Sequence, residues 1–156
     1  MSEKWDSYIR YQQYLGKTIL ALDYGEKVIG SALFTPGNDP YPLTYERIIH
    51  HSLEHVLKEL EKIIKNEEVR ILVIGVPKLL DGKITSSSKR AMKFLEICKN
   101  HFGNIEVIEQ DETLSTYEAK SRMENSPRFN FKVDMKMIDI MSALVILEDF
   151  IKEKGI

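Results

Sequence analysis

Apolar residues in this chain form short runs, and the later runs are separated by longer segments with helical spacing. A continuous apolar run of four or more residues bounded by turn residues is typical of a strand covered on both faces. The first two runs are joined by the tight turn Tyr-Gly-Glu-Lys, which predicts a hairpin. The predicted strands span residues 19–22, 28–34, 43–49, 70–75 and 105–108.

Four segments are predicted to be helices. Ser52 is a plausible N-cap for a helix with apolar residues at 53, 56, 57, 60, 63 and 64. A second helix has an apolar stripe that ends at Cys98, and Ser115 with Glu118 forms a capping box that opens a third, through about Met123. The last helix is predicted from about Asp134 to Lys152. The members of the stripe on the second helix are Ala91, Phe94, Leu95 and Cys98.

The resulting order, β-β-β-α-β-α-β-α-α, predicts an α/β fold. Three strands close together in sequence suit antiparallel pairing, whereas the two later strands, separated by helices, suit right-handed parallel crossovers. We therefore expect a mixed five-stranded sheet flanked by helices, in a single domain over residues 17–156. Residues 1–16, aromatic and polar, are expected to form an extension, either a short amphipathic helix or a partly ordered segment.

Composition narrows the class of protein. A chain of 156 residues with 43% apolar and 29% charged residues is typical of one soluble globular domain. The 22 basic and 24 acidic residues nearly balance, so a nucleic-acid partner would have to be bound by a local basic patch. The single cysteine, Cys98, fits a reducing cytoplasm, and the absence of a signal-like start or a long apolar run predicts no membrane segment.

Acidic residues follow two of the predicted strands. Asp23 ends the first strand, and Asp111 with Glu112 ends the fifth. Ligands of open α/β sheets bind beyond the carboxyl ends of the strands, so these carboxylates are expected to converge. Adjacent residues of an extended segment point in opposite directions, so only one of Asp111 and Glu112 is expected to face inward, and the sequence does not say which.

A third candidate carboxylate, Asp139, heads an otherwise apolar face of the last helix, formed by residues 139, 142, 143, 146 and 150. Carboxylates on three separate elements suit an oxygen-ligand site for Mg²⁺ or Mn²⁺, and two such ions about 3.5–4 Å apart support phosphodiester hydrolysis. The alternative is structural: Asp23 begins a turn, and Asp139 occupies the first turn of a helix, where the macrodipole favours it.

Basic and hydroxyl side chains near the start of the second predicted helix could bind phosphate. Ser86, Lys89 and Arg90 lie there, and Lys27 adds a cation beside Asp23. The alternative is an ordinary capped and solvated helix start.

Four short motifs, in order and suitably spaced over about residues 17–153, resemble those of the YqgF family of RNase H-like nucleases, also described as Holliday junction resolvases (RuvX type) and linked to pre-16S rRNA maturation. The resemblance implies an RNase H-like fold, a divalent-metal nuclease site and a structured nucleic-acid substrate, either RNA or branched DNA. The motifs are Leu22-Asp23-x-Gly25-x-Lys27-x-x-Gly30, Gly75-x-Pro77 followed by Asp81-Gly82, Asp111-Glu112-x-x-Ser115-Thr116, and Asp139-x-x-Ser142-Ala143-x-x-Ile146-Leu147.

The resemblance carries the family's acidic positions onto Asp23, the Asp111–Glu112 pair and Asp139 as catalytic residues. Of these, Asp23, Glu112 and Asp139 are taken as the metal ligands. Two family arginines are replaced, by Val28 and Thr113. Fewer cations near the scissile phosphate would weaken transition-state stabilisation, so a non-catalytic nucleic-acid-binding or ribosome-assembly module is the alternative. A kinase of the actin-like ATPase type is disfavoured because it needs two such domains.

Overall fold

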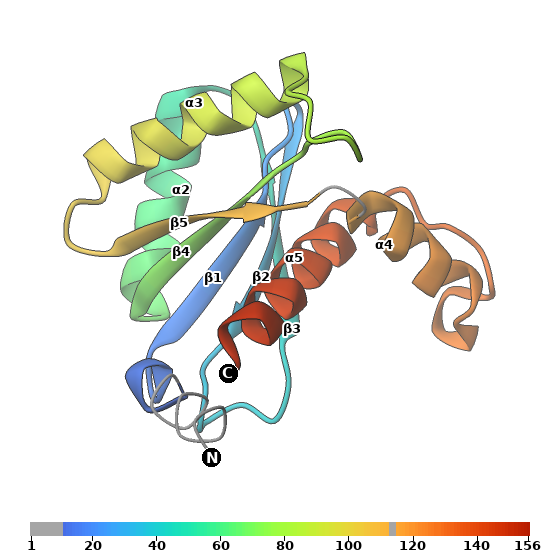
Figure 1. Cartoon of the computed structure of the whole chain (residues 1–156), viewed down its shortest axis with the longest axis horizontal. Coiled ribbons are helices and arrows are strands. Elements are labelled where there is room, and N and C mark those ends of the chain that lie inside the picture. The colour runs from blue at the N-terminus through green and yellow to red at the C-terminus, as the bar shows by residue number, and fades with distance from the viewer. Residues whose placement is uncertain (1–10, 113–114) are drawn as a thin grey trace.

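A computed structural model describes residues 11–112 and 115–156. Its centre is one five-stranded sheet with the strand order β3-β2-β1-β4-β5 (Figure 1). β1, β2 and β3 pair antiparallel, β4 lies parallel to β1, and β5 lies parallel to β4. The predicted mixed sheet is therefore confirmed. The strands are β1 (Thr18–Asp23), β2 (Val28–Phe34), β3 (Leu43–Ile49), β4 (Val69–Val76) and β5 (Glu106–Asp111).

Helices cover both faces of the sheet (Figure 1). One face is covered by α2 (Leu53–Asn66) and α3 (Ser86–His101), and the other by α5 (Ile138–Lys154). A helix α4 (Ser115–Glu124) and a 3-10 turn η1 (Pro127–Phe129) lead into α5. None of the helices in the described part of the chain is long and apolar enough to cross a membrane.

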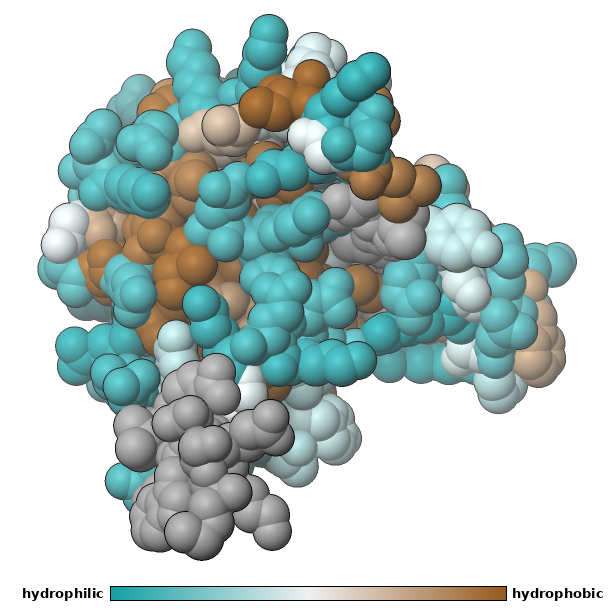
Figure 2. All heavy atoms as spheres, viewed as in Figure 1, coloured by the Kyte–Doolittle hydropathy of each residue, from teal (hydrophilic) through white to brown (hydrophobic). Residues whose placement is uncertain are grey.

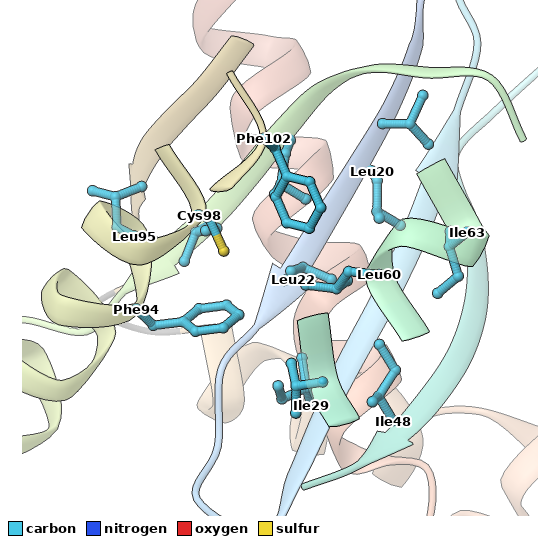
Figure 3. Close-up of a cluster of buried hydrophobic side chains, with 14 residues drawn as sticks. Leu20, Leu22, Ile29, Ile48, Leu60, Ile63, Phe94, Leu95, Cys98 and Phe102 are labelled. Carbon is cyan, nitrogen blue, oxygen red and sulfur yellow. The ribbon is translucent and has the colours of Figure 1, made fainter. Parts of the chain in front are cut away.

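The hydrophobic core has one layer on each side of the sheet. Figure 3 shows the α2–α3 layer, in which Leu60 of α2 and Phe94 of α3 point toward Leu22 of β1. On the other side, Ile146 and Phe150 of α5 lie against the sheet. Strand alternation thus sends successive residues of β1 into different layers.

The surface viewed in Figure 2 is mostly hydrophilic. Hydrophobic side chains gather at the tip of the loop between β4 and α3 (Figure 2), where Leu79, Leu80 and Ile84 are all more than half exposed.

Several element boundaries differ from the prediction, and the start of α5 differs by the most residues. α5 begins at Ile138 rather than near Asp134, because residues 134–137 form a turn: the Met137 N–H donates to the Asp134 carbonyl oxygen (3.0 Å) and the Lys136 N–H to Asp134 Oδ1 (2.9 Å). β4 is one residue longer at each end than predicted.

Parts of the predicted extension and capping box lie outside the described residues. These are residues 1–10 of the extension and the side chain of Ser115. Residues 11–14 are helical, and the Tyr14 ring contacts Phe150 edge-on, with 6.1 Å between ring centroids. Within the extension, this described turn of helix packs on the domain.

Candidate active site

Asp23, the last residue of β1, lies on the α5 side of the sheet. Leu20 and Leu22 belong to the α2–α3 layer, whereas Ile19 and Ala21 pack under α5. Asp23 points to the same side of the strand as Ile19 and Ala21, so its carboxyl group lies under α5 instead of in open solvent.

Gly30 allows α5 to approach this strand end. It is the partner of Asp23 in the β1–β2 register. A Cβ atom on Gly30 would stand 2.0 Å from the Asp139 carbonyl oxygen and 2.7 Å from the Ile140 nitrogen. Any larger residue would push the first turn of α5 outward. The glycine of the first motif therefore brings Asp139 close to Asp23.

Gly75 has the same role on β4. A Cβ atom there would stand 2.5 Å from Ile146 Cδ1 and 3.1 Å from the carboxyl carbon of Glu112. The Glu112 N–H donates to the Val76 carbonyl oxygen (3.2 Å), which extends the β4–β5 pairing beyond the last residue of β5. Glu112 is 7% exposed, and its carboxyl group is held over Gly75 on the α5 side.

Asp23 and Glu112 form a hydrogen-bonded carboxyl pair. The pKa of Asp23 is raised well above its ordinary value, chiefly by burial, then by the charge of Glu112 and the hydrogen bond to it, and last by the charge of Asp139. Repulsion between two carboxylates in contact disfavours ionisation of both, so the pair favours a shared proton or a bound cation.

Asp139, in the first turn of α5, is half-buried next to this pair. Burial raises its pKa, and the charge of Arg47 and a hydrogen bond to its own backbone oppose that rise. In the part of the chain that the structure describes, no three acidic, histidine or cysteine side chains lie close enough to complete a metal site. The pair and Asp139 are therefore electrostatic neighbours rather than a preformed set of three ligands.

Asp111 is not brought into this cluster. It is exposed and lies on the same side of β5 as Val107, which packs toward α2 and α3. The structure therefore places Glu112, and not Asp111, beside Asp23. Thr113, which stands in place of the second family arginine, lies outside the described residues.

Arg47 was not predicted from the sequence. It is the register partner of Gly30 on β3, and its charge acts on Asp139. The β2–β3 register shifts between Gly30 and Ala32, where two residues of β3 lie opposite one of β2. Such a bulge interrupts strand alternation, so the sequence pattern did not place Arg47 on the α5 side.

A pocket of about 380 Å³ opens beside Asp139, between the β1–β2 turn and the start of α3. Its lining includes two cationic residues, Lys27 and Arg90, and two acidic ones, Glu26 and Asp139. Arg90 Nε lies 2.9 Å from Glu26 Oε1, and an Arg90 Nη atom donates to Ser87 Oγ (3.2 Å). We call this cavity, lined also by Tyr24, Gly25, Val28 and Pro77, the phosphate pocket.

Two other predicted phosphate ligands lie outside the pocket lining. Ser86 and Lys89 are exposed on the first turn of α3. The hydroxyl groups of Thr85 and Ser88 cap the helix, and Ser88 Oγ also donates to the Pro77 carbonyl oxygen. This end of α3 therefore combines an ordinary capping box with one pocket-lining cation, Arg90.

Ser142 lies one turn after Asp139 on the same face of α5. It is 1% exposed, and among the described residues its hydroxyl has no hydrogen-bond partner. Ile146, one turn further on, covers Gly75. A buried hydroxyl without a partner is costly, so Ser142 is a further polar group on the face of α5 that carries Asp139.

The sheet order, the helix across β1 and β2, and the acidic residues at the strand ends define an RNase H-like fold of the resolvase class. The fowlpox virus Holliday junction resolvase is similar in structure, with a TM-score of 0.57 at 13% identity, over 87% of this chain and 99% of that one. Thermus thermophilus RuvC, solved with a Holliday junction substrate, has a TM-score of 0.53 at 8% identity, over 88% of this chain and 96% of that one. At these identities the likeness establishes the fold.

The chain belongs to the RuvX Holliday junction resolvase family, whose model matches residues 17–153. Two similar relatives carry the name "Putative pre-16S rRNA nuclease". One, from Mesomycoplasma hyopneumoniae, is 33% identical over 87% of this chain and 94% of its own. The other, from Clostridium botulinum, is 32% identical over 85% and 95%. The suspected family is thereby confirmed, and with it membership of a family of nucleases.

Proposed function

We propose that this protein is a divalent-metal-dependent nuclease that hydrolyses phosphodiester bonds in structured nucleic acid, in pre-16S rRNA processing or in the resolution of branched DNA. The observation that carries the proposal is the buried Asp23–Glu112 pair, which adjoins Asp139 and a pocket containing Lys27 and Arg90. A buried pair of carboxyl groups does not stabilise an apolar core, and this pair lies where open α/β sheets bind ligands.

The donor set suits Mg²⁺ or Mn²⁺. Asp23 and Glu112 supply carboxylate oxygens, and Asp139 supplies a third carboxylate nearby. A bound divalent cation would lower the pKa of a coordinated water and stabilise charge on the phosphoryl oxygens. It would also replace the proton that the carboxyl pair otherwise holds.

The protein's own groups position the substrate. Lys27 and Arg90 in the phosphate pocket would hold the backbone beside Asp139, and Glu26 would orient the guanidinium of Arg90. The charge of Arg47 would favour the ionised form of Asp139, because it opposes the rise in pKa that burial causes. Lys27 and Arg90 line the same pocket as Val28, which replaces a family arginine.

A cleavage assay tests the proposal. Structured RNA carrying unprocessed 16S ends and four-way DNA junctions are each incubated with the protein in Mg²⁺, Mn²⁺ or EDTA. We expect metal-dependent cleavage that Asp23→Asn abolishes and that the neighbouring exposed substitution Asp111→Asn leaves within about twofold of the parent. Whichever substrate is cut identifies the natural class.

The alternative, a non-catalytic nucleic-acid-binding module, makes the opposite prediction. Such a module would bind the same substrates in EDTA but cleave none of them in either metal. Cleavage by Asp23→Asn at the rate of the parent would instead show that the assigned site is wrong.

A further inference from the structure

A second, smaller pocket of about 240 Å³ adjoins the phosphate pocket and shares Tyr24 and Arg90 with it. The remaining lining comes from the residue that follows β3, the first residue of α2 and the middle of α3. We propose that this second pocket binds one unpaired nucleobase of the substrate, next to the phosphate held by Lys27 and Arg90. The proposal rests on the proposed function. The lining is Tyr24, His50, Leu53, Arg90, Lys93, Phe94 and Ile97.

Stacked aromatic rings form one wall of this base pocket. The Tyr24 ring lies against Phe94 with 4.5 Å between centroids and 23° between planes. Phe94 is 2% exposed and belongs to the α2–α3 core layer, so it fixes the tyrosine ring in place. A rigid aromatic side chain at the pocket wall offers a base a contact surface without the entropic cost of ordering it.

His50 adds a polar group with a defined orientation. Its Nδ1 lies 3.1 Å from the Gly25 carbonyl oxygen, which can only accept, so Nδ1 carries the proton. Its ring meets the Tyr24 ring at 65°, with 5.6 Å between centroids. In the neutral imidazole, Nε2 is therefore an acceptor, suited to an N–H group on a base edge.

Aliphatic side chains and one cation complete the lining. Leu53 is 40% exposed, Ile97 is half-buried, and Lys93 is exposed. Two of the seven lining residues, Arg90 and Lys93, are cations, whereas four are aromatic or aliphatic and His50 supplies a ring nitrogen. This mixture matches the faces and edges of a base better than it matches a second phosphate. The volume is below the roughly 300 Å³ at which sites for drug-sized ligands begin, which suits one base rather than a whole nucleotide.

The position of the pocket defines the substrate more narrowly. Tyr24 follows Asp23 directly in the chain, and Arg90 lines both cavities, so a base here would be close to the phosphate beside Asp139. A base stacked and paired inside a duplex cannot enter such a cavity. We therefore infer that cleavage requires an unpaired or frayed nucleotide next to the cut.

Abasic scanning tests this inference. Binding to a fluorescein-labelled RNA hairpin with a single-stranded tail, and to its DNA equivalent, is measured by anisotropy in EDTA while each tail nucleotide is made abasic in turn. We expect one position at which the parent loses about 5- to 150-fold in affinity, the fold-change that corresponds to one stacked base.

The variant Leu53→Gln should lose this sensitivity. Its affinities for the intact probe and for the probe that is abasic at the sensitive position should agree within about twofold. Ile97→Gln serves as a second variant on another element. Leu43→Gln is the matched control, because Leu43 is similarly exposed (49%) at the far end of β3, and it should keep the full sensitivity of the parent.

Equal binding of all abasic probes by the parent would overturn the inference, as would an equal weakening of intact and abasic probes by Leu53→Gln. Failure of the proposed function gives a different result. If the parent shows abasic sensitivity but cleaves nothing in either metal, the base pocket is supported and the proposed nuclease activity is refuted.

Discussion

Replacing Glu112 with Gln should make the metal-free protein more stable at neutral pH, because two of the effects that raise the pKa of Asp23 come from Glu112. A carboxyl group whose folded-state pKa is raised contributes stability that is complete below the unfolded-state value near 4. That contribution is lost as the pH rises, at about 1.4 kcal/mol per pH unit, until the folded-state pKa is passed.

The Gln side chain keeps the shape of Glu112 and can still hydrogen-bond Asp23, but it removes the neighbouring charge. The pKa of Asp23 then falls, and the loss of stability ends at a lower pH. Each unit by which the pKa of Asp23 falls raises the free energy of unfolding at pH 7 by about 1.4 kcal/mol. For a domain of this length, 1.4 kcal/mol corresponds to a melting-temperature rise of about 3–6 °C.

Thermal melts of the parent and the variant from pH 4 to pH 8 in EDTA measure this directly. Mg²⁺ at one hundred times its dissociation constant should stabilise the parent by about 2.7 kcal/mol, or about 5–10 °C, and Glu112→Gln much less. Asp111→Asn is the matched control, since it removes an exposed charge one residue earlier. The reasoning is refuted if Glu112→Gln melts below the parent at pH 7 in EDTA, or if both melting temperatures fall equally with pH.

Three further substitutions test other parts of the site. Gly30→Ala should force the first turn of α5 away from the strand, with a cost of about 1–3 kcal/mol in urea unfolding and a larger proportional loss of cleavage as Asp139 moves. Arg47→Gln should raise the pKa of Asp139, so the acidic limb of the pH–rate profile should move to higher pH. Arg90→Ala should reduce the slope of log K against log salt by about one, whereas Lys89→Ala, outside the pocket, should change it less.

The strands were predictable because their signals are local. The run over residues 19–22 and the run over 70–75 are continuous, apolar and bounded by turns, which leaves little alternative to buried strands. The start of α5 was placed too early because Met135 and Met137 continue the apolar pattern, although the side chain of Asp134 closes a turn there instead of capping the helix.

The site itself depends on register, which the sequence shows only in part. Acidic residues at strand ends could be recognised, but the choice between Asp111 and Glu112 required the β4–β5 alignment. The position of Arg47 on the α5 side depends on a bulge that the residue pattern of β3 does not predict. The base pocket joins His50 and Phe94, which are 44 residues apart, and the Tyr24 ring contacts both of them.

The packing of α5 on Gly30 and Gly75 also has a consequence for synthesis of the protein. Asp23 emerges from the ribosome early, but the helix that carries Asp139 and buries one whole face of β1 emerges more than a hundred residues later. Until then the nascent chain has neither a closed core nor an assembled acidic cluster. The core on the α5 side of the sheet and the acidic cluster are therefore completed in the same step, when α5 packs on β1 and β2.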